Sequence, residues 1–99
     1  MIDQKELDYF NYGKIENQKF WRRFGHKPNL QNRNVLDFGC GHGALCIELA
    51  NLGASKVIGI DLEEKLLNFA NINFQQNYKN YQSIIDFQKK DLLKTNFQN

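Results

Sequence analysis

The sequence predicts an α/β domain built on a parallel sheet, and three observations support this prediction. An apolar segment over 34–38 runs directly into a glycine-rich loop and then into a helical pattern over about 43–52. A β-branched run over 56–60 begins a second such unit, and a third apolar segment lies at about 83–88. Because strand and helix patterns alternate, right-handed crossovers should place the strands side by side and parallel.

The N-terminal segment, residues 1–28, is predicted to form one or two short helices, since Leu7 and Phe10 follow a helical spacing. Gly13 is expected to interrupt this segment and Gly25 to end it. We expect the segment to pack as an amphipathic cover on the sheet rather than to border a ligand. Aromatic side chains at helical spacing usually belong to a core.

Each later element has its own local signal. The helix over 43–52 should end at Gly53, where a left-handed residue can close it. The uninterrupted β-branched character of 56–60 is typical of a parallel strand that is buried on both faces. The next helix carries Glu63 and Glu64 in its first turn, where the helix dipole favours negative charge.

The loop after the first strand has glycine at 39, 41 and 43, and it follows an acidic residue, Asp37. Glycine has no Cβ to block a close approach, and it tolerates positive φ. The helix that begins directly afterwards adds unpaired N–H groups at the same place. The loop is therefore predicted to cradle a small molecule.

Two ligand classes use such a loop. The spacing Gly39-x-Gly41-x-x-Ala44, with Asp61 about 20 residues further on, matches the dinucleotide fingerprint. Asp37 argues against a dinucleotide, because a carboxylate beside a pyrophosphate costs on the order of several kcal/mol at an effective dielectric constant near 20. S-adenosylmethionine has no phosphate and carries an ammonium and a sulfonium group, so nearby carboxylates favour it.

Three motifs resemble those of the class I S-adenosylmethionine-dependent methyltransferases. Residues 35–43, Val-Leu-Asp-Phe-Gly-Cys-Gly-His-Gly, resemble the first motif, and residues 57–62, Val-Ile-Gly-Ile-Asp-Leu, resemble the second. Asp91 and Leu92, which follow the third strand, resemble the third motif. The three occur in the order and at the spacing of that family.

The resemblance implies a Rossmann-like three-layer sandwich with strand order 3-2-1 and helices on both faces. Residues 29–99 would be the N-terminal half of such a domain, which stops before the fourth strand, and residues 1–28 would be a helical segment ahead of it. The first strand would then lie at a sheet edge with unpaired backbone groups. We expect weak stability or self-association unless the N-terminal helices cover that edge.

The resemblance also assigns roles in the first motif. Gly39, Cys40 and Gly41 would pass close under the methionine portion of the cofactor. Asp37 would hold its ammonium group, directly or through water.

The resemblance assigns nucleoside-binding roles to residues of the second and third motifs. Asp61 would accept both ribose hydroxyls, for which two carboxylate oxygens are suited. Leu62 would pack on one face of the adenine. Asp91 would accept from the exocyclic amine, and Leu92 would supply a backbone N–H to the ring.

The function implied is S-adenosyl-L-methionine binding and methyl transfer to an unidentified acceptor, with a small molecule as the default expectation. An NAD(P)-dependent oxidoreductase and an inactive truncated cofactor-binding fragment remain as alternatives. No catalytic residue is assigned. His42 has no partner visible in the sequence, so we assign it no proton-transfer role.

Composition limits the partners. The 99 residues carry a net charge of +2 with both signs interspersed, so nothing indicates a nucleic-acid or membrane surface. The spacing of Cys40 and Cys46 fits no zinc or haem pattern, so we expect no metal and two free thiols in a reducing cytoplasm. No signal peptide or apolar run of membrane length is present. The oligomeric state is left open.

Overall fold

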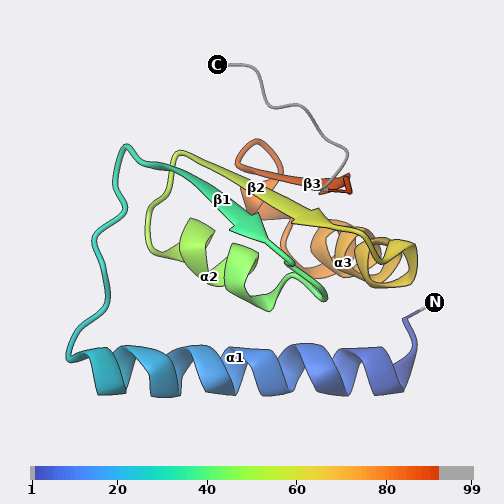
Figure 1. Cartoon of the computed structure of the whole chain (residues 1–99), viewed down its shortest axis with the longest axis horizontal. Helices are drawn as coiled ribbons and strands as arrows, with labels where there is room; N and C mark the ends of the chain where they lie inside the picture. Colours follow the sequence, from blue (N-terminus) through green and yellow to red (C-terminus); the bar gives the residue numbers. More distant parts are fainter. Residues whose placement is uncertain (1, 92–99) are drawn as a thin grey trace.

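The computed structural model describes residues 2–91 and contains one three-stranded parallel sheet (Figure 1). The strands lie in the order β1-β2-β3, which confirms the predicted 3-2-1 arrangement. In chain order the elements are α1 (Gln4–Phe24), β1 (Asn34–Phe38), α2 (Ala44–Asn51), β2 (Lys56–Asp61), α3 (Glu64–Asn77), the 3-10 turn η1 (Lys79–Tyr81) and β3 (Ile85–Lys89).

The parallel register brings the carboxyl ends of the strands to one edge of the sheet. Asp37 on β1 lies opposite Gly59 on β2, and Asp61 at the end of β2 lies opposite Lys89 on β3. The loop after β1 is fastened to this edge, because the N–H groups of Gly39 and Cys40 both donate to the carbonyl of Ile60, at 2.7 and 3.0 Å. Loops that follow parallel strands therefore converge here.

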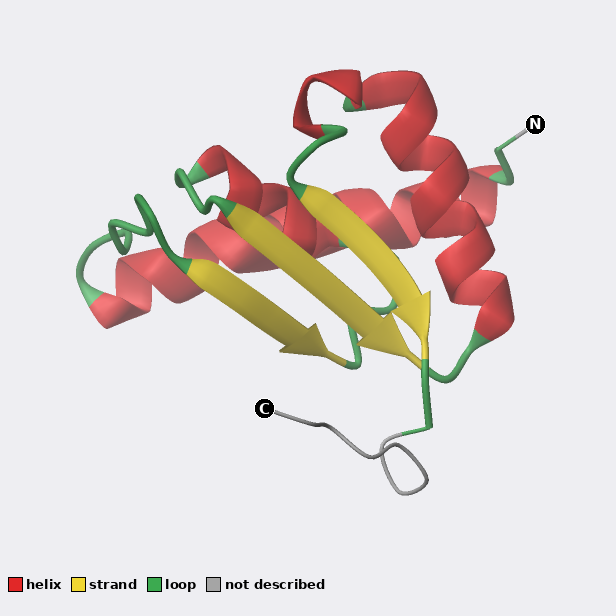
Figure 2. Cartoon of the chain, turned by 90° about the horizontal axis from the view of Figure 1, so that it is seen from above, coloured by secondary structure: helices red, strands yellow, loops and turns green. Residues whose placement is uncertain are grey.

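All three described helices lie on the same face of the sheet (Figures 1 and 2). This corrects the expectation of helices on both faces. Two successive right-handed crossovers that move in one direction along the sheet place α2 and α3 on the same side. The three layers are thus the sheet, the pair α2 and α3, and α1 as the outermost layer.

The opposite face of the sheet carries apolar side chains that the described helices do not cover. Leu36 and Phe38 on β1 are 49% and 53% exposed. On the covered face, by contrast, Val57 is completely buried. The sheet is therefore sealed on one side only among the described residues.

The N-terminal segment is a single helix of 21 residues, so the predicted interruption at Gly13 is wrong. A Cβ at Gly13 would lie 2.9 Å from the Cβ of Ala44. Glycine at this position lets α1 approach α2 closely, and the packing gained outweighs its low helix propensity. The helix begins at the cap Asp3, whose side chain accepts from the N–H of Lys5, and it ends as predicted at Gly25 with φ of 107°.

Helix α1 packs on α2 and α3 rather than directly on the sheet. Its Phe10 is 1% exposed and contacts the rings of Phe69 and Tyr78, with ring centroids 6.1 and 5.8 Å away. The cover predicted for 1–28 is therefore a second helical layer. None of the helices in residues 2–91 has the length and apolar character needed to cross a bilayer.

Candidate functional site

The glycines of the loop after β1 have different structural tasks. All three have positive φ, at 72° for Gly39, 54° for Gly41 and 87° for Gly43. A Cβ at Gly39 would meet nothing within 4 Å, whereas a Cβ at Gly43 would lie 2.9 Å from the ring of Phe87. Gly43 is therefore required for packing against β3. Gly39 leaves open space beside the loop, which a ligand could use.

Asp61 is fixed at the end of β2 by both of its carboxylate oxygens. One oxygen accepts from the N–H of Gly41 at 2.8 Å, and the other accepts from the N–H of Glu63 at 2.9 Å. Each carboxylate oxygen can accept a second hydrogen bond, so the group keeps capacity for donors from a ligand. The next residue, Leu62, is 59% exposed beside it.

Asp37 lies half-buried on the covered side of β1, at the base of the loop. Its carboxylate accepts from the thiol of Cys46 at 3.3 Å. Burial raises the pKa of Asp37, and the negative charge of Asp61 adds to this effect. A cation close to the two carboxylates would relieve both costs.

The two cysteines are free thiols, as predicted, and they form part of the core beneath the loop. Cys46 is completely buried, and its pKa is raised by contact with the Cys40 thiol and by burial, so it remains protonated. A Cβ at Gly59 would lie 2.8 Å from the sulfur of Cys46 and 3.1 Å from that of Cys40. The side chain of Cys40 therefore points into the core, and only its backbone faces the loop.

The third motif reaches the same edge of the sheet. The N–H of Lys90 donates to the carbonyl of Asp61 at 3.1 Å, which places the segment after β3 next to the end of β2. Asp91 follows directly and is half-buried. Leu92 lies outside the described residues. The structure thus brings together at one edge every predicted site residue that it describes.

His42 has a partner that sequence reasoning missed. Its Nε2 lies 2.5 Å from a carboxylate oxygen of Glu6, which is a buried residue near the start of α1. The hydrogen bond with His42 holds the pKa of Glu6 below its ordinary value, and Lys65 acts in the same direction. The rings of Tyr9 and Phe69 pack around the imidazole. The glycine loop is therefore tied to α1.

One sequence signal could have indicated this contact. Glu6 lies four residues before Phe10, so both belong to the same, buried face of one helix. A carboxylate on a buried helix face requires a partner.

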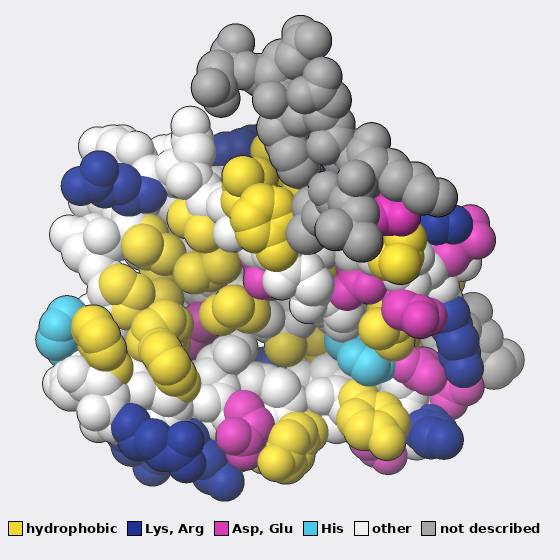
Figure 3. Space-filling model, in the orientation of Figure 1, with side chains coloured by type: hydrophobic (Ala, Val, Ile, Leu, Met, Phe, Trp, Pro, Cys, Tyr) yellow, Lys and Arg dark blue, Asp and Glu magenta, His cyan; other side chains and the backbone are white. Residues whose placement is uncertain are grey.

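Acidic side chains gather at the end of the molecule toward which the strands point, with lysines among them (Figure 3). Within residues 2–91, no group of three or more histidine, cysteine, aspartate or glutamate side chains could hold a metal ion. The edge therefore offers carboxylates, open space beside a glycine and an exposed leucine. This combination is suited to an organic ligand that carries positive charge.

Comparison with known proteins identifies the fold family. A family model described as a methyltransferase domain matches residues 29–98. The chain belongs to this methyltransferase family. Membership decides between the two ligand classes that the glycine pattern left open, and it does so against the dinucleotide oxidoreductases.

Curated relatives in this family include enzymes named ribosomal protein L11 methyltransferase. That of Klebsiella pneumoniae is 45% identical over 49 residues, which are 50% of this chain and 17% of the relative. That of Vibrio vulnificus is 47% identical over the same number of residues and the same shares. The chain thus spans about a sixth of the length of these methyltransferases.

Solved methyltransferase structures share the fold. An S-adenosylmethionine dependent methyltransferase from Mesorhizobium loti is 30% identical with a TM-score of 0.59, over 73% of this chain and 31% of that one. A magnesium protoporphyrin IX methyltransferase from Synechocystis, with bound SAH, is 28% identical with a TM-score of 0.62, over 97% of this chain and 43% of that one. The strand order and helix placement described above are therefore those of a partial methyltransferase fold.

Proposed function

We propose that the carboxyl edge of the sheet binds S-adenosyl-L-methionine and that the chain belongs to an enzyme that transfers its methyl group. The observation that carries this proposal is the pair of carboxylates, Asp37 and Asp61, beside a glycine loop with open space at Gly39. Solved relatives have bound SAM or SAH, which supports the choice of cofactor.

The first motif would hold the methionine portion. Gly39 and Gly41 allow the ligand to approach the backbone, and Cys40 would take part through its backbone alone, since its side chain lies in the core. Asp37 would compensate the ammonium group of the cofactor, directly or through water. Its raised pKa marks a site where a cation is favourable.

The second and third motifs would hold the nucleoside. Asp61 would accept the ribose hydroxyls with the acceptor capacity that its two backbone contacts leave. The exposed side chain of Leu62 would pack on the adenine. Asp91 would accept from the exocyclic amine, and Leu92 would donate its backbone N–H to the ring.

When bound, S-adenosylmethionine supplies an electrophilic methyl group on its sulfonium. The residues of this chain would bind and orient the cofactor, and positioning accounts for much of the catalysis of such a transfer. No general base is assigned among the described residues. The contact of His42 with Glu6 gives it a role in holding the loop to α1.

Two acceptor classes are in competition. The balanced charge of the chain favours a small molecule, which is our first proposal. The curated relatives carry the name of a methyltransferase for ribosomal protein L11, and this likeness favours a protein acceptor as the second. Transfer of a labelled methyl group from S-adenosylmethionine to purified ribosomal protein L11, compared with transfer to a small-molecule extract, would separate the two.

The two free thiols also suggest a compartment. Cys40 and Cys46 lie together in the core without forming a disulfide. Free thiols are typical of proteins kept in a reducing environment. We therefore propose a cytoplasmic location.

Calorimetry with S-adenosylmethionine, S-adenosylhomocysteine and NAD, run in parallel on the chain, tests the cofactor. Both sulfur compounds should bind, and NAD should not. The variant Asp61→Ala should weaken cofactor binding by about 1.5–3 kcal/mol, the range for a hydrogen bond to a charged group. A heat of binding with NAD alone, or no heat of binding with any of the three compounds, would refute the proposal.

A matched control removes the same charge elsewhere on the sheet. Asp86 is exposed on β3, where it accepts from the side chain of Gln88. Asp86→Ala should leave cofactor affinity unchanged. An equal loss in both variants would mean that net charge, rather than the position of Asp61, governs binding.

A further inference from the structure

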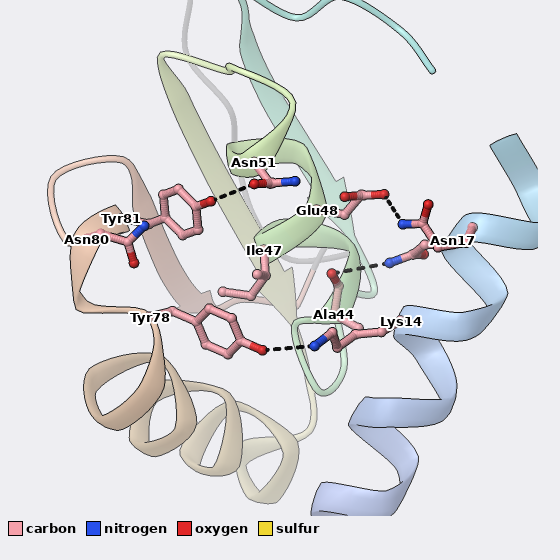
Figure 4. Close-up of a pocket in the computed structure, with 10 residues that line it drawn as sticks. Lys14, Asn17, Ala44, Ile47, Glu48, Asn51, Tyr78, Asn80 and Tyr81 are labelled. Atoms are coloured by element: carbon pink, nitrogen blue, oxygen red, sulfur yellow. Dashed lines mark hydrogen bonds between the residues drawn. The ribbon is translucent and has the colours of Figure 1, made fainter. Parts of the chain in front are cut away.

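A cavity lies on the side of α2 that faces α1, and its volume is about 400 Å³ (Figure 4). Helix α2 begins at the glycine loop, and the cavity follows the helix away from that loop to Asn51, its last residue. None of the residues proposed to hold the cofactor lines the cavity. The cavity is lined by side chains from α1, from α2 and from the segment 78–81.

Hydrogen bonds between these elements hold the walls in place. Gln18 and Trp21 on α1 both donate to one carboxylate oxygen of Glu48 on α2, at 2.6 and 2.8 Å. The hydroxyl of Tyr81 donates to the side-chain oxygen of Asn51 at 2.9 Å. Because each contact joins two different elements, the cavity is pre-formed.

The cavity carries one cation and one anion. Lys14 forms no ion pair with any residue in the described range, and its ammonium lies 3.4 Å from the hydroxyl of Tyr78. Glu48 is 8% exposed and is held by neutral donors alone among its hydrogen bonds. Lys14 lies one helical turn, about 6 Å, from Gln18, which contacts Glu48. The two charges are thus separated along the cavity rather than paired.

The remaining lining is half amide and half aromatic or aliphatic. The amide side chains are those of Asn17, Gln18, Asn51 and Asn80. Tyr78 and Tyr81 contribute their rings from the segment after α3, and Ile47 contributes an aliphatic side chain from α2. The volume is near the lower end of the range for small-molecule sites, which is about 300–1,000 Å³. A ligand of the size of a single amino acid fits this space.

We propose that this cavity is a binding site for a free α-amino acid with an aromatic side chain. Its carboxylate would lie at Lys14 and its ammonium at Glu48, while its ring would pack against Tyr78 and Tyr81. An α-amino acid carries its ammonium and its carboxylate on one carbon, and a cavity with one cation and one anion can pair both groups, whereas a simple anion or cation uses only one of them. The site is distinct from the proposed cofactor site and does not depend on methyl transfer.

Occupation of this site would have a structural consequence. A ligand in contact with α1, α2 and the segment 78–81 joins the outer helix to the layer beneath it. Binding to the folded state alone raises the stability of the protein by mass action. The amino acid would therefore fasten α1, which also carries Glu6, the partner of His42 in the glycine loop.

The test is a calorimetric titration with L-phenylalanine and with two analogues, each of which lacks one charge. L-Phenylalanine should bind, whereas 3-phenylpropionate, without the ammonium, and 2-phenylethylamine, without the carboxylate, should each bind about ten- to hundredfold more weakly. Equal binding of all three compounds, or no binding of L-phenylalanine, would overturn the proposal.

A pair of variants tests whether L-phenylalanine binds in this cavity. Lys14→Met removes the cation of the cavity and should weaken L-phenylalanine binding about tenfold or more. Lys19→Met removes the same charge on the same helix, at a side chain that contacts Glu16 outside the cavity, and should have no effect. Equal affinities in the two variants would refute the role of Lys14.

Competition separates this site from the cofactor site. The affinity for L-phenylalanine should be unchanged when S-adenosylhomocysteine is present in excess. Displacement by S-adenosylhomocysteine would show that the amino acid binds at the carboxyl edge and would overturn the proposal. Binding of L-phenylalanine to a chain that fails to bind S-adenosylhomocysteine would uphold this proposal while refuting the proposed cofactor.

Discussion

The two faces of the sheet differ in what covers them, because the described helices all lie behind one face (Figure 2). On the covered face, Gly59 is enclosed by two sulfur atoms and the ring of Phe87, and Val57 is completely buried. On the open face, Leu36 and Phe38 expose about half of their surface. Burial on the open face is uneven, because Ile60, which lies opposite Phe38 on the same face, is only 1% exposed.

This difference shows where the stability of the described fold resides. Parallel sheets normally have both faces covered by helices. Here the described helices cover one face, and the buried cluster that includes Val57, Cys46 and Leu67 lies between that face and the helices. Self-association through the open face or the β1 edge therefore stays a prediction. Helix α1 packs on α2, so it does not cover that face.

The largest effect is expected from Gly59→Ala on the covered face. The added methyl group would lie within 2.8–3.1 Å of Cys46, Phe87 and Cys40. Overpacking a filled core costs typically 1–3 kcal/mol and occasionally more, and we expect a loss of about 3 kcal/mol in the free energy of unfolding. Urea denaturation measures it. Leu36→Ala on the open face is the control, and equal losses in both variants would contradict the comparison.

A smaller loss is expected between the two helical layers. Trp21→Phe keeps a ring but removes one of the two donors to the buried carboxylate of Glu48. Loss of a donor to a buried charged group should lower the free energy of unfolding by about 1.5–3 kcal/mol. Phe24→Leu, at a ring that is 60% exposed on the same helix, should change it by less than about 0.5 kcal/mol. An unchanged free energy of unfolding in Trp21→Phe would mean that the hydrogen bond from Gln18 alone is sufficient for the Glu48 carboxylate.

On the open face the expected change is in association rather than in stability. Phe38→Ser removes an exposed apolar side chain and should alter the free energy of unfolding by less than about 1 kcal/mol. Sedimentation velocity should show a smaller self-associated fraction than in the unmodified chain. Tyr12→Ser, at a ring that is 61% exposed on α1, should leave association unchanged. A strictly monomeric unmodified chain would refute the expectation.

The smallest effects concern pH and have opposite signs at two carboxylates. The pKa of Asp37 is raised by folding, so its ionisation costs stability as pH rises from the ordinary aspartate range through the folded pKa. Asp37→Asn should therefore be more stable than the unmodified chain at neutral pH, with the difference vanishing in acid. The same variant should bind S-adenosylmethionine more weakly.

At Glu6 the folded pKa is lowered, so its contribution is present above the ordinary glutamate value and is lost as pH falls through the folded pKa. Glu6→Gln should be less stable than the unmodified chain at neutral pH, and the two should converge in acid. Thermal denaturation across pH 3–7 measures both variants. Parallel pH profiles for the two would contradict the assignment.

The first two strands were predictable because each is a local apolar run that ends at a glycine or an aspartate. The third, β3, begins at Ile85 and ends at Lys89, whereas the prediction was about 83–88. The ends of β1 at 34 and 38 agree with the prediction, and β2 extends one residue further, to Asp61. The site residues could be predicted for the same reason, since the ends of parallel strands meet at one edge. Their roles in binding stay predictions.

Long-range packing could not be predicted from local sequence patterns. Gly13 has the local signature of a helix breaker, yet its contact with Ala44 arises only when α1 lies on α2. The pairing of Glu6 with His42 spans 36 positions and depends on the same docking. The placement of α2 and α3 on one face follows from the direction of both crossovers, which no single segment encodes.

The buried thiols beneath the glycine loop have a practical consequence. Cys40 and Cys46 are 8% and 0% exposed, and the pKa of Cys46 is raised, so an alkylating reagent can reach them only when the loop and α2 separate from the sheet. The rate of alkylation in the native state therefore measures how often this local opening occurs. If a nucleoside ligand slows the alkylation, the glycine loop has closed around the ligand. This readout needs no label in the site itself.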